Sequence, residues 1–367
     1  MADLLVFLGG FGRSAVEEMV AGAHEAITLD TLERAEAAGC FRRVIVQTDR
    51  QSFGAGLDGR VEWCPSQSPF HFGESLAELI RRYGIRRPFY IGGGSVPLLP
   101  AEALAGIVGR LTGVEHTVIT NNLFSADLVA FTPGEAIEAI DLPPTDNLLA
   151  QLLRRQAGLR EVCLERTAAT QFDIDTPTDL LILQVHPEAG PHISAYLNSL
   201  HLDTTRLRAA MGYLTDPQAE VLVAGRVGSQ VWMHLEKDTA CRVRLFSEER
   251  GMRAYERDTR GQARSLLGAY LQEVGVYRFF RALGEMGNAV FIDSRVVFAH
   301  LGWRPSAEDR FLSDLGRVQE IRSPYLQEFT QGALEAPMPV ILGGHSLVAG
   351  GLLALIDAAW LERDASA

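Results

Sequence analysis

Lysine is almost absent from this chain, which has one lysine, Lys237, among 34 basic residues. Acidic residues number 46, so the formal net charge is −12. Proteins that bind the phosphate backbone of nucleic acids usually carry a basic domain or stripe, so this balance argues against a nucleic-acid partner. A small anionic ligand remains compatible with it, because such a ligand needs only a few local donors.

Cysteine is scarce as well, and long apolar runs are missing. The four cysteines form no Cys-x-x-Cys pair, which removes zinc knuckles and thioredoxin-type sites from consideration. No apolar stretch reaches the roughly 18 residues of a membrane span, and the N-terminus lacks the basic region of a signal peptide. We therefore expect a cytoplasmic protein with reduced cysteines and no membrane partner.

The length of 367 residues predicts two domains, since one domain usually takes about 100–200 residues. In the first half, short apolar runs such as Leu4–Leu8 and Pro88–Ile91 alternate with helical patterns. Such alternation predicts a mostly parallel sheet with right-handed crossovers. The pattern is interrupted near residues 186–204 and then restarts, so the predicted domains are 1–190 and 200–367, both of the α/β class.

Glycine-rich turns follow two of the predicted strands. The first is Gly9-Gly10-Phe11-Gly12-Arg13, and the second is Gly92-Gly93-Gly94-Ser95. In an open α/β sheet, ligands bind at the carboxyl ends of the strands. Glycines there let backbone N–H groups approach phosphate oxygens, and a guanidinium can hold a phosphate with two hydrogen bonds. The alternative is that these turns are only tight connections between strand and helix.

A pair of carboxylates lies near residue 175, in the run Phe172-Asp173-Ile174-Asp175-Thr176-Pro177. Residues two apart on an extended segment face the same side. Such a pair can hold Mg²⁺ through oxygen ligands while the metal bridges substrate phosphates. Thr176-Pro177 then opens a helix. The alternative is a charged strand end in which Thr176 or Asp175 caps that helix.

The segment Asp-Ile-Asp-Thr-Pro-Thr-Asp-Leu, residues 173–180, resembles the closing motif of MobA-like nucleotidyltransferases. This family includes the guanylyltransferases of molybdenum cofactor and the phospholactate guanylyltransferases. The turn from Gly9 to Arg13 takes the place of the family's phosphate loop, and Gly93–Leu99 is similar to its Gly-Asp-x-Pro-Leu segment. The resemblance covers residues 3–185 and implies a Rossmann-like nucleotidyltransferase domain of GT-A type.

The resemblance also implies an activity, the Mg²⁺-dependent transfer of a nucleotidyl group from a nucleoside triphosphate to a small phosphorylated acceptor. The residues that would bind the triphosphate are Gly9, Gly10, Gly12 and Arg13. Those that would bind the nucleotide or its sugar are Gly93, Gly94 and Ser95. Arg13, Asp173 and Asp175 would be catalytic, with the two aspartates as metal ligands. A homodimer is the default expectation for the assembly.

Two departures from the family pattern support a second hypothesis. The family's phosphate loop carries a lysine after its arginine, whereas Lys237 lies far outside the loop. The family's first metal aspartate falls on Ser95, whose neutral hydroxyl is a poorer magnesium ligand. Asp127, Asp146 and Asn147 are possible replacements. The alternative function is a nucleotide- or sugar-phosphate-binding protein whose C-terminal domain carries the main activity or a partner contact.

Residues 200–367 show no family motif, but polar residues follow their predicted strands. These candidates are Glu248, Glu249, Arg250, Asp293, Arg295, His300, Gly344 and His345. Together they could line one cleft, with carboxylates for a metal or acid–base work and arginine for an anion. His345 could exchange a proton near neutral pH. The alternative is a set of solvated strand ends, internal ion pairs and glycines that ease helix–strand packing.

Overall fold

The structure is a computed structural model that describes residues 1–9 and 12–366. It contains two compact α/β units, as the sequence predicts. The first unit comprises Met1–Phe11, Ala21–Asp173 and Gly190–Tyr196. The second comprises Gly12–Val20, Ile174–Ala189 and Leu197–Ala367. Each unit therefore takes in short segments from the other half of the sequence.

The first unit is built on a mostly parallel sheet, which confirms the predicted fold class. Within the described residues this sheet has seven strands in the order β3-β2-β1-β4-β6-β5-β7. Their bounds are β1 Ala2–Leu8, β2 Phe41–Thr48, β3 Glu62–Pro65, β4 Pro88–Gly92, β5 Thr117–Thr120, β6 Leu128–Thr132 and β7 Arg160–Cys163. Strand β6 runs antiparallel to β4 and β5, and the other neighbouring pairs are parallel.

Helices cover both faces of this sheet, because alternate residues of its strands point into two different cores. On β1, Leu5 and Phe7 pack in one core, and Leu4 and Val6 pack in the other. The main helices are α1 Ala15–Ala38, α2 Gln51–Ala55, α3 Phe72–Tyr83, α4 Ala101–Thr112, α5 Leu149–Arg155 and α6 Ala168–Gln171. Helix α1 passes from one unit to the other, since its residues up to Val20 belong to the second unit.

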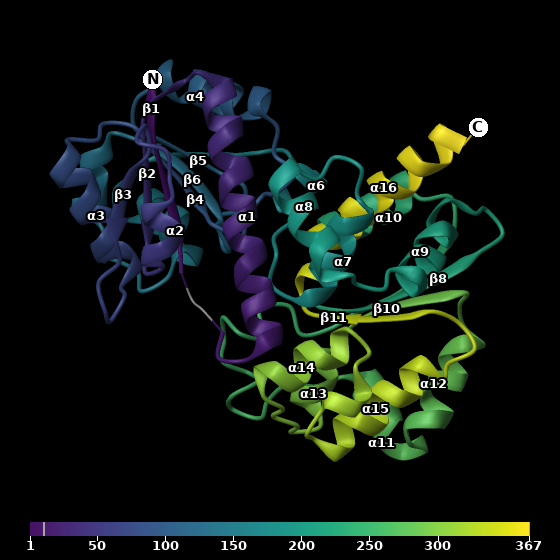
Figure 1. Cartoon of the computed structure of the whole chain (residues 1–367). Coiled ribbons are helices and arrows are strands. Elements are labelled where there is room, and N and C mark those ends of the chain that lie inside the picture. Colours follow the sequence, from purple (N-terminus) through teal and green to yellow (C-terminus); the bar gives the residue numbers. More distant parts are fainter. Residues whose placement is uncertain (10–11, 367) are drawn as a thin grey trace. The chain divides into compact units, whose positions relative to one another are not determined.

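The second unit has a fully parallel sheet whose strand order is β11-β10-β8-β9. Its strands are β8 Glu220–Gly225, β9 Arg242–Ser247, β10 Ala289–Asp293 and β11 Val340–Gly343. The helices from α7 onward are α7 Pro177–Val185, α8 Pro191–Leu200, α9 Thr205–Gly212, α10 Ser229–Asp238, α11 Leu266–Val274, α12 Val276–Gly284, α13 Ser294–His300, α14 Ala307–Asp314, α15 Pro324–Leu334 and α16 Gly350–Ser366. In Figure 1, α13, α14 and α15 lie on one side of β10 and β11, and α7 and α16 lie on the other.

Aromatic side chains dominate the core on the α11–α15 side of the second sheet. The rings of Phe279, Phe280, Phe298 and Phe329 are buried and contact one another at centroid distances of 5.0–5.4 Å. Burying one such side chain contributes about 1.5–3 kcal/mol. This core supports the strands whose carboxyl ends are described below. Among the described residues, none of the helices has both the length and the apolar character of a membrane span.

Candidate functional site

The order of the first sheet reverses between β1 and β4. From β1 the chain continues to β2 and β3 on one side, whereas β4 pairs with β1 on the other side. A reversal of this kind opens a crevice at the carboxyl ends of the two strands, where ligands of α/β sheets bind. Gly9 directly follows β1, and Gly93, Gly94 and Ser95 directly follow β4. Four of the predicted nucleotide-binding residues therefore lie at this switch point.

The glycines after β4 are needed for close packing in that turn. A side chain at Gly93 would lie 2.8 Å from the Leu8 side chain, and one at Gly94 would overlap the His24 ring. The Gly93 N–H donates to the Phe7 carbonyl at 2.9 Å, and its carbonyl accepts from the Thr28 hydroxyl at 3.2 Å. The turn is thus held against β1 and α1, at the edge where a ligand would bind.

Asp173 is joined to this turn through the backbone. An isolated antiparallel bridge links it to Ser95, and the Val96 N–H donates to the Phe172 carbonyl at 3.1 Å. Ser95 is buried and Asp173 is half-buried. The structure therefore brings the closing motif and the β4 turn together, so that a carboxylate and a hydroxyl lie in neighbouring backbone positions at the switch point.

Two further aspartates lie beside β4. The Gly92 N–H donates to the Asp127 carbonyl at 3.1 Å, and the Tyr90 hydroxyl donates to the Asp146 carboxylate at 2.7 Å. Burial, Asp146 and Asp127 together raise the pKa of Tyr90 well above its ordinary value. The Asn121 amide accepts from the Asp127 N–H at 3.2 Å and donates to its carboxylate at 3.3 Å. The sequence had suggested these two aspartates without placing them.

Other members of the predicted nucleotide site belong to the second unit. The first turn of α1 is capped by Glu17, whose carboxylate accepts from the N–H groups of Arg13 and Ser14 at 3.2 and 3.1 Å. Gly12, Arg13 and Asp175 are all part of this unit, and Arg13 and Asp175 are exposed. Gly10 lies outside the described residues.

The second sheet has its own reversal, between β8 and β10. Strand β9 lies on one side of β8, whereas β10 and β11 lie on the other. At this point Arg226 forms two hydrogen bonds to Asp293, at 2.5 and 3.1 Å, and both side chains are buried. A side chain at Gly225 would overlap Asp293, and this glycine has a φ of +128°. A glycine is therefore required for the ion pair to form.

A second buried ion pair lies next to the first. Arg295 donates to Asp314 through both terminal nitrogens, and one of these also donates to the Ser294 hydroxyl at 2.9 Å. Burial by itself raises the pKa of Asp293, but Arg226, His345 and Arg295 outweigh it and hold this pKa below the ordinary range. Burial raises the pKa of Asp314 despite the opposing effect of Arg295.

His345 and Asp179 lie at the end of β11. His345 is exposed, yet desolvation by the surrounding protein and the charge of Arg226 lower its pKa, while Asp293 and Asp175 act in the opposite direction. Asp179 is fully buried and accepts from the Ser346 hydroxyl at 2.7 Å. Burial raises the pKa of Asp179 to about 7. Asp179 can therefore change protonation near neutral pH, whereas the lowered pKa of His345 moves its titration away from neutral pH.

Other predicted residues of the second unit make internal contacts. Glu248 accepts from the Ser265 hydroxyl and the Leu266 N–H, each at 2.6 Å. Glu249 accepts from Arg257 at 2.7 Å, and His300 accepts from the Ser265 N–H at 3.1 Å. These bonds hold the loop after β9.

The two remaining predicted residues, Arg250 and Gly344, lie in turns at the carboxyl edge of the second sheet. Arg250 is exposed beside Gly228, and Gly344 packs against Thr176.

The sequence analysis did not identify four residues at the carboxyl edge of the second sheet as members of the site. They are Asp179, Arg226, Asp314 and Ser346. A signal existed for Arg226, which follows an apolar strand in a Gly-Arg-Val-Gly-Ser turn, and for Asp179, which belongs to the closing motif. Asp314 lies inside a helix, where no local pattern marks it.

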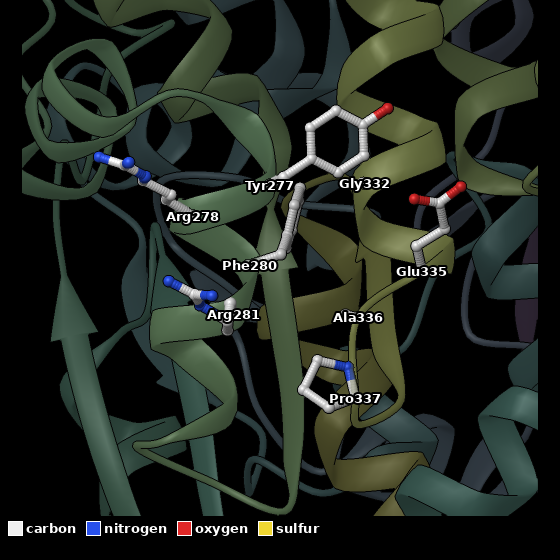
Figure 2. A pocket seen from close by; sticks show the side chains of 8 residues that line it. All are labelled: Tyr277, Arg278, Phe280, Arg281, Gly332, Glu335, Ala336 and Pro337. Carbon is white, nitrogen blue, oxygen red and sulfur yellow. The ribbon is translucent and has the colours of Figure 1, made fainter.

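Two other features of the described residues do not include the residues of either switch point. A cavity of about 460 Å³ between α12 and the end of α15 is lined by Tyr277, Arg278, Phe280, Arg281, Gly332, Glu335, Ala336 and Pro337 (Figure 2). None of the predicted site residues lines it. The second feature is a cluster of Asp30, Glu33 and His192. Asp30 caps α8 by accepting from the N–H groups of His192 and Ile193 at 2.9 and 3.0 Å, so helix capping explains its position.

No family model matches the chain, and no curated protein matches it. Among solved structures, the bifunctional IspDF from Campylobacter jejuni is 11% identical and has a TM-score of 0.32; the match covers 46% of this chain and 51% of that one. This chain thus spans about half the length of that protein. A cytidylyltransferase from Leptospira borgpetersenii serovar Hardjo-bovis is 16% identical, with coverage of 55% and 94% and a TM-score of 0.37. The 4-diphosphocytidyl-2C-methyl-D-erythritolsynthase from Anaerococcus prevotii is 14% identical, with coverage of 54% and 95% and a TM-score of 0.34.

Proposed function

We propose that the first unit transfers a nucleotidyl group from a nucleoside triphosphate to a small phosphorylated acceptor. The main support is the junction of Asp173 with Ser95 at the switch point between β1 and β4. The glycines that follow both strands lie at the same point, at the carboxyl edge where ligands of α/β sheets bind. The MobA-like motif at residues 173–180 supports the same reaction class.

In this proposal the acceptor's phosphate oxygen attacks the α-phosphorus of the triphosphate. The bond between the α-phosphorus and the bridging oxygen breaks, and pyrophosphate leaves with that electron pair. Gly9 would bind the triphosphate, and Gly93, Gly94 and Ser95 would face the nucleotide. Positioning and charge neutralisation account for most of the catalysis in phosphoryl chemistry.

Magnesium suits the donors present at this edge. Asp173, whose backbone bridges to Ser95, supplies a half-buried carboxylate, and Asp127, whose backbone carbonyl accepts from Gly92 of β4, supplies another. Oxygen donors of this kind are the ones that Mg²⁺ prefers. We propose Asp173 as a ligand, with Asp175 as the second ligand that the family motif implies. When bound, the metal would neutralise charge on the substrate phosphates.

The test is pyrophosphate release from each nucleoside triphosphate with Mg²⁺ and a panel of small phosphorylated acids. Asp173→Asn should abolish release, and Asp58→Asn, an exposed aspartate of the same unit, should leave it intact. Thermal midpoints with and without Mg²⁺ and nucleotide check binding separately. A folded wild-type protein without turnover on any pair, or an Asp173→Asn variant as active as wild type, would contradict the proposal.

A binding protein that has lost transfer activity is the second candidate. It is favoured by Ser95, because a hydroxyl stands where the family has a metal-binding carboxylate. This candidate expects nucleotide binding that is indifferent to Mg²⁺ in calorimetry. A strong Mg²⁺ requirement that disappears in Asp175→Ala would rule it out.

A further inference from the structure

A histidine of helix α1 lies against the turn that follows β4. His24 and Thr28 are four residues apart, so they share one face of α1. The Thr28 hydroxyl donates to the Gly93 carbonyl at 3.2 Å. One helical turn closer to the start of α1, the His24 ring packs on Gly94, where a side-chain carbon would overlap the Cδ2 and Nε2 atoms of the ring. A glycine at position 94 is therefore required to leave room for the imidazole.

This contact brings the imidazole to the ligand-binding edge of the first unit. Gly93 and Gly94 directly follow β4, at the carboxyl edge of the sheet and beside the strand reversal where ligands of this fold class bind. The part of α1 that belongs to the first unit begins at Ala21, so His24 lies in the first turn of that part. The residue is half-buried, which leaves part of its surface accessible.

A triphosphate bound at this edge needs hydrogen-bond donors that offset its negative charge. Arg13, which the sequence predicts for this role, is part of the second unit. Two arginines at the same edge of the first unit already have partners, since Arg34 donates to the Pro97 carbonyl at 2.5 Å and Arg50 pairs with Glu25 at 2.8 Å. The imidazole on the β4 turn is a third basic group at this edge, and its Nε2 atom lies directly at the turn.

We propose that His24 is a substrate-binding residue of the first unit, and that its Nε2–H group donates a hydrogen bond to a phosphate oxygen of the nucleoside triphosphate. The identity of the ligand rests on the proposed function of this unit. Nε2 carries a proton in the imidazolium and in one neutral tautomer, and the charged form makes the stronger bond to phosphate. A ring that only packed on Gly94 would need its shape but not its N–H group, and this difference can be measured.

The experiment is isothermal titration calorimetry of the full chain with ATP, GTP, CTP and UTP, each with Mg²⁺. His24→Leu keeps a side chain of similar size without an N–H group, and it should weaken binding by about tenfold or more, since a hydrogen bond to a charged group is lost. His24→Lys should recover much of the affinity, because an ammonium group also donates to phosphate.

His116→Asn is the matched control. His116 is an exposed histidine of the same unit that directly precedes β5, at the amino edge of the sheet. Asparagine tolerates its φ of +49°. A second measurement uses the wild-type protein. The ring ¹⁵N signals of His24, assigned by their absence from the spectrum of either His24 variant, should shift when the triphosphate binds.

Weaker binding in His24→Leu, recovery in His24→Lys and no change in His116→Asn support the assignment. Equal affinity in wild type and His24→Leu overturns it, as does a His24→Lys variant as weak as His24→Leu. Ring signals that stay in place at saturating triphosphate overturn it as well. Binding that depends on His24 without any pyrophosphate release would contradict the transfer function and leave the role of His24 standing. A wild-type protein that binds none of the four triphosphates overturns both.

Discussion

Replacement of Asp179 by asparagine should change the stability of the second unit in a pH-dependent way. One oxygen of this buried carboxyl group accepts from the N–H groups of Asp175 and Thr176 at 3.1 and 2.7 Å, and from the hydroxyls of Thr176 and Ser346 at 2.9 and 2.7 Å. The other oxygen is buried and has no hydrogen-bond partner among the described residues. Ionisation therefore places a partly compensated charge inside the protein.

The magnitude follows from the pKa of Asp179. Burial is the main cause of its rise from 3.8 to about 7; the bond from Ser346 opposes the rise, and the charge of Asp175 adds to it. The interval from 3.8 to about 7, at about 1.36 kcal/mol for each pH unit, corresponds to about 4 kcal/mol. Because the folded-state pKa is raised, this stability is fully present below pH 3.8 and is lost as the pH rises through about 7.

Asparagine keeps the acceptor oxygen but cannot ionise. Its amide N–H group has no partner in the position of the unbonded oxygen, which costs about 1–3 kcal/mol. We therefore expect Asp179→Asn to be less stable than wild type by that amount below pH 3.8, and this deficit should shrink as the pH rises toward 7. At pH 8 the order should reverse, because the wild type then bears the cost of a buried carboxylate.

Urea unfolding followed by tryptophan fluorescence at several pH values, in EDTA, tests this prediction. In a Trp63→Phe background the remaining tryptophans are Trp232, Trp303 and Trp360, all of the second unit. Asp203→Asn is the control, because hydrogen bonds lower the pKa of Asp203, so its contribution is lost as the pH falls. A difference between Asp179→Asn and wild type that stays constant from pH 5 to pH 8 would refute the reasoning.

Three further predictions concern stability and are checked by urea unfolding. Gly225→Ala should destabilise the second unit by about 2 kcal/mol or more, because its φ is +128° and a side chain would overlap Asp293. Asp293→Asn should cost about 3–5 kcal/mol by leaving Arg226 buried and unpaired. The double variant Arg226→Met/Asp293→Leu should recover most of that loss, and failure to recover it would show that the ion pair is not the cause. Asp30→Ala should cost the first unit about 0.5–2 kcal/mol by uncapping α8.

The sequence predicted the α/β class because buried parallel strands are continuous apolar runs, which are easily distinguished from amphipathic helices. The ends of strands were harder to predict where a strand contains a buried charged residue. Strand β1 begins at Ala2 rather than Leu4, and it includes Asp3, whose carboxylate accepts from Arg42 at 3.0 and 2.8 Å. A charged residue next to the N-terminus gave no sign that a distant arginine would compensate it.

For a similar reason, local sequence patterns could not predict which segments of the chain belong to each unit. The chain from Gly12 to Val20 belongs to the second unit because Val16 packs in that unit's core, although its sequence continues the loop that follows β1. The closing motif is divided as well, with Asp173 in the first unit and Asp175 in the second. A motif shows which residue types are present, but the packing of apolar neighbours decides to which core each residue belongs.

The carboxyl edge of the second sheet shows what can be predicted from the rule that residues directly after parallel strands lie at one edge of the sheet. It selected Asp293, Arg295 and His345, because polar residues directly after buried strands must lie at the carboxyl edge. It could not show that Asp314 neutralises Arg295, since that carboxylate comes from inside a helix. The partner of each arginine therefore follows from three-dimensional packing, whereas the position of the edge follows from sequence.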